Sequence, residues 1–245
     1  MAIVATDIKI YETKSTAAAD GESGGNGLGG YRSSDEITTN VDENLFDNVT
    51  AAESEAGDTE YRAFMIKNTH ATLSFVNAKV YLSVTANTPF SDLTTQLENG
   101  GSETTVDVTD ASAFPSSGSF FVEDEEITFT GKTGNQFTGC TRGANSTSKV
   151  LHAVGKIAEH NQIRICVEEP SSKTTGYILT IASEGVEPAG SPTWSNVYSF
   201  STGLSIGTLA PSEFYGVWVR RKIPAGCKAK TGISYTIARK GETEE

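Results

Sequence analysis

Hydrophobic and polar side chains alternate in short runs along most of the chain. Such alternation sends successive side chains to opposite faces of a strand and predicts β-strands that bury one face. Glycine, proline or serine bounds nearly every run, as in the turns of an antiparallel sandwich or barrel. The runs lie at residues 3–11, 60–68, 71–84, 161–167, 177–181, 197–200, 204–209, 213–221 and 231–238. No stretch has a clear helical period, and we therefore predict an all-β protein.

A second, self-contained β-rich pattern interrupts the first between residues 98 and 160. It includes the hydrophobic run at 121–129 and ends with 151–157. We therefore predict an outer β-sandwich domain of residues 1–97 joined to 161–245, with 98–160 inserted as a small β domain. A loop of a sandwich accepts such an insert at little cost in closure entropy when the ends of the insert lie close together.

The segment from residue 12 to residue 60 is rich in glycine and in acidic side chains. Its stretch 17–30 has too many glycines for a helix and too few apolar side chains for a core. We predict an extended Gly-rich arm that lies over a neighbouring copy and orders on contact. Leu45 and Phe46 are expected to anchor the arm in a short turn, with their side chains pointing inward.

Charge is distributed unevenly along the chain. The formal net charge of -12 argues against sequence-independent binding of nucleic acid by the whole chain. Residues 1–60 carry thirteen acidic and three basic side chains, whereas residues 211–240 carry one acidic and seven basic side chains. These opposite charges allow pairing either within one fold or between neighbouring copies. Arg220, Arg221 and Lys222 form the candidate basic surface for such a contact.

The bulk properties of the chain argue against several classes of protein. The mean hydropathy is -0.28 and no apolar run approaches the ~18 residues of a membrane span. The first residues lack the basic region of a signal peptide, so we expect synthesis in a cytoplasm. The three cysteines, Cys140, Cys166 and Cys227, include no CxxC pair. They are expected to be buried thiols rather than disulfides or zinc ligands.

Motifs in the outer pattern and in the insert resemble segments of structural proteins of tailed bacteriophages. The outer motifs are DIKIY at 7–11, NLFD at 44–47, YRAFMIKNTH at 61–70, LSIGTLAP at 204–211 and GVWVRRKIPAG at 216–226. The insert motifs are VDVTDASAFPSSG at 106–118, FVEDEEITFT at 121–130, FTGCTRG at 137–143 and LHAVGKI at 151–157. The resemblance implies an Ig-like antiparallel β-sandwich carrying a small β-barrel-like module, present in many copies on a particle.

The sequence contains several possible catalytic, cofactor and metal-binding motifs, but none has the context that its function needs. Residues 25–30 satisfy GxGxxG, but no strand directly precedes them and no helix follows, so no cofactor is expected. The histidines, His70, His152 and His160, are expected in turns or at the surface rather than in a metal site. The acidic run at 123–126 is expected to be a solvated hairpin turn rather than a calcium site. No spacing typical of a hydrolase is found, and we do not expect an enzyme.

The two tryptophans receive different predictions. Trp218 lies in an alternating run and is expected in the core, because a tryptophan there buries a large area. Trp194 lies in a loop rich in serine and proline, and it is a candidate contact to a partner. An alternative function follows from Trp194, namely a module that binds a host-surface glycan and presents the loops of the insert outward.

The sequence thus predicts a structural virion protein that is made in the host cytoplasm and acts in the particle. A head decoration or cement role is preferred, with a neck or tail and baseplate position as the alternative. The expected partners are copies of the chain and other virion proteins, such as the major capsid, neck or tail proteins, without contact to a membrane or to nucleic acid. The candidate partner-binding residues are Arg220, Arg221, Lys222, Leu45, Phe46 and Trp194.

Overall fold

The computed structural model describes residues 2–16, 19–38, 44–84, 88–227 and 235–243 of the 245-residue chain. The chain is an all-β protein built of several antiparallel sheets, as the alternating pattern predicts. Most of the predicted runs form strands at or near their expected positions. The predicted run at 197–200 is not a strand, and the beginning of the run at 231–238 lies outside the described residues.

The largest sheet has six strands in the order β12-β15-β3-β1-β2-β13. These strands are β1 (Ile8–Lys14), β2 (Gly29–Glu36), β3 (Asp58–Asn68), β12 (Gln162–Glu168), β13 (Tyr177–Thr180) and β15 (Phe214–Ile223). Its longest pairing joins β3 to β15, with Lys67 opposite Phe214 at one end and Asp58 opposite Ile223 at the other. Segments from both ends of the chain therefore meet in the middle of this sheet.

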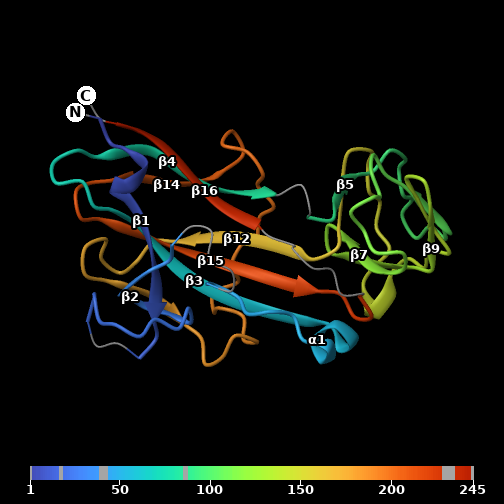
Figure 1. The fold of residues 1–245 in the computed structure, drawn as a ribbon, viewed down its shortest axis with the longest axis horizontal. Coiled ribbons are helices and arrows are strands. Elements are labelled where there is room, and N and C mark those ends of the chain that lie inside the picture. The colour runs from blue at the N-terminus through green and yellow to red at the C-terminus, as the bar shows by residue number, and fades with distance from the viewer. Residues whose placement is uncertain (1, 17–18, 39–43, 85–87, 228–234, 244–245) are drawn as a thin grey trace.

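A three-stranded sheet covers one face of the six-stranded sheet and completes a sandwich (Figure 1). It has the order β14-β4-β16, formed by β4 (Phe75–Val84), β14 (Leu204–Leu209) and β16 (Tyr235–Thr243). The core between the sheets takes every second residue of the central strands, such as Phe64 and Ile66 of β3. This alternation is the one from which the strands were predicted.

The opposite face of the six-stranded sheet is also buried. Ala63 and Met65 of β3 pack there with Trp218 of β15, which is only 1% exposed and lies in the core as predicted. Leu28 and Trp194, from two loops, pack against the same cluster. The six-stranded sheet is thus the middle layer of the molecule, between the smaller sheet and a layer of loops.

The insert forms a separate unit at one end of the sandwich (Figure 1). Its sheets have the orders β5-β11-β7-β8 and β6-β10-β9. The strands are β5 (Phe90–Asp92), β6 (Thr105–Asp107), β7 (Gly118–Val122), β8 (Glu125–Phe129), β9 (Gly131–Thr133), β10 (Gln136–Thr138) and β11 (Ile157–Glu159). Its core holds a cluster of phenylalanines, in which the rings of Phe120 and Phe137 stack 4.5 Å apart.

The insert begins earlier than the predicted boundary at residue 98. Leu93 and Leu97 belong to its core, and β5 pairs with β11 at the far end of the insert. The first strand of the insert therefore lies beside its last strand. The boundary at residue 98 was placed next to the glycines at residues 100 and 101, which were interpreted as a hinge. A three-residue strand such as β5 leaves almost no periodic signal that would have moved the boundary earlier.

The described part of the segment 12–60 is folded onto the sandwich instead of forming an extended arm. Residues Gly29–Glu36 form β2 between β1 and β13 of the large sheet. A short helix, α1 (Ala51–Ala56), follows, and Thr50 caps it by accepting from the amide of Glu53. The prediction of an arm was wrong here because glycines that fit tightly against neighbouring strands were read as glycines of a loop.

Two short 3-10 helices, η1 (Ala5–Asp7) and η2 (Ala144–Ser146), complete the secondary structure. None of the helices in the described ranges has the length and apolar character that a membrane crossing needs.

Candidate functional site

The basic residues of β15, Arg220, Arg221 and Lys222, are the first candidates for binding a partner. In the structure they contact groups of their own chain. Arg221 donates through Nε to Glu60, at 2.5 Å, and lies 3.3 Å from the carboxylate of Asp47. Its guanidinium also stacks over the ring of Phe46, 4.7 Å from the ring centre. The charge distribution allowed the acidic and basic segments to pair either within one copy or between copies. The contacts of Arg221 are pairs within one copy.

Arg220 and Lys222 face the insert. Arg220 donates to Gln162 at 2.6 Å and lies 3.7 Å from the carboxylate of Asp124. The ammonium of Lys222 lies 4.6 Å from the ring centre of Phe121. Burial lowers the pKa of both basic groups, and for Lys222 the neighbouring Arg220 lowers it further. Both residues therefore help to hold the insert on the sandwich, and their predicted role in binding a partner stays a prediction.

The remaining candidate residues also make internal contacts. Leu45 and Phe46 are partly buried against the core of the sandwich, which confirms their inward orientation. Trp194 is half-buried, donates through Nε1 to Glu187 at 2.7 Å and lies 5.5 Å from the ring of Tyr61. Its other neighbour is Arg220, 5.4 Å from the ring centre. This packing adds no support to the alternative of a glycan platform at Trp194.

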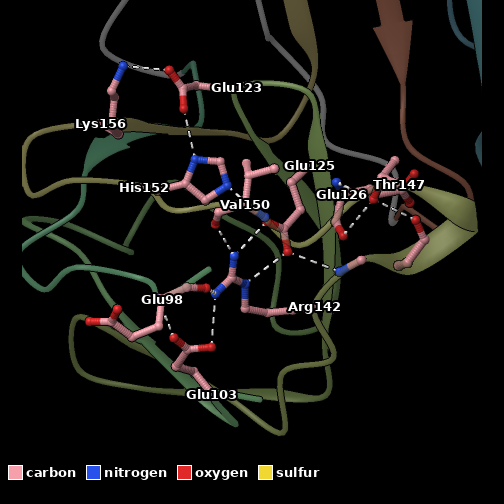
Figure 2. Close-up of polar contacts among 12 residues, drawn as sticks. Glu98, Glu103, Glu123, Glu125, Glu126, Arg142, Thr147, Val150, His152 and Lys156 are labelled. Atoms are coloured by element: carbon pink, nitrogen blue, oxygen red, sulfur yellow. Dashed lines mark hydrogen bonds and ion pairs between the residues drawn. The ribbon is translucent and has the colours of Figure 1, made fainter. Parts of the chain in front are cut away.

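A buried ionic network in the insert is the densest polar constellation of the described residues (Figure 2). Glu125 on β8 accepts two hydrogen bonds from Arg142, at 2.8 and 2.7 Å, and lies 2.9 Å from Nε2 of His152. The side chains of all three residues are 0% exposed. The other nitrogen of His152 contacts Glu123 at 2.8 Å, and Glu123 also pairs with Lys156.

In the buried part of the network, the side-chain polar atoms of Glu125, Arg142 and His152 all have partners inside the insert, whereas Glu123 and Lys156 at its edge are partly exposed. The amides of Gly143 and Val150 donate to the Glu125 carboxylate, and Arg142 donates further to the backbone of Glu98 and Val150. Burial disfavours the Glu125 carboxylate, but the hydrogen bonds from Arg142 and His152 outweigh burial and lower the pKa of Glu125. A fully hydrogen-bonded buried group of this kind makes the fold around it rigid.

The network could not be predicted from the sequence, and the predictions for the acidic run and for two of the histidines were wrong. Glu125 and Glu126 are 1% and 4% exposed, so only the first half of the acidic run at 123–126 forms the solvated hairpin turn. His152 and His160 are buried, at 0% and 2% exposed, whereas His70 lies in a turn as expected. The partners Arg142 and His152 lie 17 and 27 residues from Glu125, a separation at which no local pattern reports contact.

Two backbone amides of the glycine-rich stretch bind a carboxylate of the same chain. The amides of Gly24 and Gly25 donate to Asp35 at 2.6 and 2.7 Å. Elsewhere in the described ranges, no group of three histidine, cysteine or acidic side chains is arranged to hold a metal ion.

The cysteines are buried thiols, as predicted, and burial governs their chemistry. Burial raises the pKa of Cys140 and of Cys166 to about 12. It also raises the pKa of Cys227, which lies 3.4 Å from the hydroxyl of Ser54. A thiol with such a pKa is almost entirely protonated at neutral pH and is a poor nucleophile.

Two hollows lie on the surface of the described residues. A pocket of about 480 Å³ lies beside the ionic network and is lined by Glu123, Asp124, Glu125, Ser146, Thr147, Ser148 and Val150. A second pocket of about 400 Å³ lies at the end of β12, and its walls are mainly apolar. Comparison of the chain with family models, with curated proteins and with solved structures finds no match in any of the three.

Proposed function

We propose that this chain is a structural component of a tailed-phage virion, with head decoration preferred over a neck or tail position. The order of the sequence motifs in the outer pattern and in the insert supports the family of proteins. The geometry that carries the proposal is a β frame whose six-stranded sheet is buried on both faces and whose insert is fixed to one end. Such a frame suits a part that bears load between neighbours.

Basic side chains of β12 and β15 help to attach the insert to the sandwich. Arg164 of β12 pairs with Glu159 of β11 at 2.8 Å, and their side chains are 6% and 1% exposed. Ser119 donates to the carbonyl of Ala225, and the ring of Phe90 packs on that of Tyr198. These contacts give the molecule a fixed outline, which repeated assembly on a particle requires.

Protein composition of purified particles tests the proposal. Particles are banded on a density gradient, and the chain is quantified by mass spectrometry against the major capsid protein. A structural role predicts many copies per particle that remain bound through the gradient. Particles that carry no copies would remove the structural role. A deletion of the chain then separates the positions, since loss of a decoration protein weakens the head to heat, whereas loss of a neck or tail protein leaves heads without tails.

A further inference from the structure

An asparagine is followed by a glycine at two places in the chain, Asn26-Gly27 and Asn99-Gly100. Such a pair can react with itself, because glycine has no side chain to keep its backbone nitrogen away from the amide carbon of the asparagine side chain. The fold decides whether the pair reacts, since the asparagine side chain must be free to turn toward that nitrogen. The two pairs differ in this freedom.

Asn99 and Gly100 form the tip of a turn of the insert, between β5 and β6. The Gly101 amide closes the turn by donating to the carbonyl of Glu98 at 3.1 Å. Gly100 has a φ of +69°, which favours glycine in a turn, and a Cβ atom there would meet nothing within 4 Å. Asn99 is exposed, and no described residue forms a hydrogen bond with its side chain. The Asn99 side chain is therefore free to turn.

The side chain of Asn26, in contrast, is held by three hydrogen bonds. Its Oδ1 accepts from the amides of Leu28, at 3.1 Å, and Ser15, at 3.3 Å. Its Nδ2 donates to the hydroxyl of Ser15 at 2.9 Å. The neighbouring glycine is also crowded, since a Cβ atom at Gly27 would lie 2.9 Å from the side chain of Arg62. The Asn26 side chain must break its hydrogen bonds before it can turn toward the Gly27 nitrogen.

The backbone nitrogens of the two glycines are bonded alike. The Gly100 amide donates to the carbonyl of Lys149, and the Gly27 amide donates to the carbonyl of Thr13, both at 3.1 Å. Each nitrogen must therefore give up one similar hydrogen bond before it reacts. The difference in reactivity between the pairs then comes from the asparagine side chains, and three hydrogen bonds of ordinary net strength slow a reaction on the order of a hundredfold.

We propose that Asn99 is a site of self-modification, where the folded chain converts asparagine to aspartate and isoaspartate. The Gly100 nitrogen forms a bond to Cγ of Asn99 and gives its proton to water. The side-chain nitrogen takes up a proton and leaves as ammonia, and the product is a succinimide ring. Water then adds to one or the other carbonyl carbon of the ring and breaks its bond to nitrogen. The first opening gives aspartate, and the second gives isoaspartate, in which the backbone runs through the side chain.

The modification places a new negative charge beside the ionic network of the insert. The carbonyl of Glu98 accepts from Arg142 at 2.6 Å, and the amide of Glu98 donates to the carboxylate of Glu103 at 2.6 Å. The charge at residue 99 adds to those of the two glutamates, and the longer backbone of isoaspartate strains the turn that positions Glu98. The reaction does not depend on the proposed function. A virion protein is not replaced after assembly, however, so in a particle the modified form would accumulate with age.

Peptide mass spectrometry of the purified chain tests the site, after incubation for increasing times in mildly alkaline buffer and in concentrated urea. In the folded chain, Asn99 is expected to convert at least about tenfold faster than Asn26. In urea the two are expected to convert at similar rates, because both precede a glycine and the hydrogen bonds of Asn26 are lost. Labelling by an isoaspartate methyltransferase identifies the isoaspartate product.

Two variants, checked for folding by thermal unfolding, test the cause. Asn99→Gln, whose longer side chain must close a larger ring, is expected to lose the product at this position and to leave Asn26 unchanged. Ser15→Ala removes the hydroxyl that holds Asn26 and is expected to raise the rate at Asn26 about fivefold. Equal rates at Asn99 and Asn26 in the folded chain, or an Asn99 that converts only in urea, would overturn the inference. The composition of purified particles tests the proposed function separately.

Discussion

Glu125 is the residue on which the insert depends most. Its carboxylate faces the fully buried guanidinium of Arg142, and removal of one partner from such a pair leaves an uncompensated charge. Glu125→Gln is expected to lower the free energy of unfolding by about 3 kcal/mol. Glu103→Gln, which removes the partly exposed carboxylate on the other side of Arg142, is expected to cost less than about 1 kcal/mol. Urea denaturation of both variants measures the difference, and equal costs would contradict the assignment.

The same carboxylates predict how stability depends on pH. The pKa of Glu125 and that of Glu123 are lowered in the fold, so their contribution is present above the ordinary pKa of about 4.3 and is lost as the pH falls through the folded pKa. Burial raises the pKa of Glu126, and its contribution has the opposite sign, since protonation of Glu126 on acidification favours the fold. Glu125→Gln should flatten the acid loss of stability, whereas Glu126→Gln should steepen it. Denaturation at several pH values measures both slopes, and the same slope in both variants would refute this account.

The cysteines provide a test of burial that needs no substitution. With a pKa of about 12, Cys140 and Cys166 hold almost no thiolate at pH 8. A disulfide reagent is expected to label them more than about a thousandfold more slowly in the native chain than in denaturant. In denaturant all three thiols should react. Rapid labelling of the native chain would show that the thiols are accessible.

At the scale of elements, Gly29 fixes the place of β2 in the large sheet. Its φ is +77°, and a Cβ atom there would lie 1.8 Å from the carbonyl oxygen of Leu179 on β13. Gly134 also has a positive φ, of +58°, but has open space around it. Gly29→Ala is therefore expected to cost about 3 kcal/mol or more, and Gly134→Ala about 1 kcal/mol. Thermal unfolding compares them, and a similar cost for both would mean that β2 and β13 do not approach closely.

The strand that begins at Gly29 could not be predicted from the sequence, although the long strands could. The long strands were predictable because runs such as Phe64 and Ile66 repeat every second residue on a buried face. A strand such as β2, with glycines where its neighbours come closest, has the composition of a loop. The network around Glu125 was hidden for a different reason, since its members come from separate segments and each resembles a surface residue when taken alone.

At the level of the whole molecule, pairs of opposite charges hold one chain together. Arg221 pairs with Glu60 and Asp47, which lie far from it in the sequence, and Arg164 pairs with the nearby Glu159 at the junction of the sandwich and the insert. The composition predicted opposite charges at the two ends of the chain but left open whether they pair within a copy or between copies. The pairs within the chain make the frame rigid.

Electron microscopy of purified particles, with a label fused to the C-terminus of this chain, tests whether the chain is part of the virion. We expect label at regular positions on every particle, spread over the head for a decoration protein. Label confined to the neck or tail would retain the structural role and correct its position. Particles without any label, from cells that express the labelled chain, would contradict the claim that the chain is part of the virion.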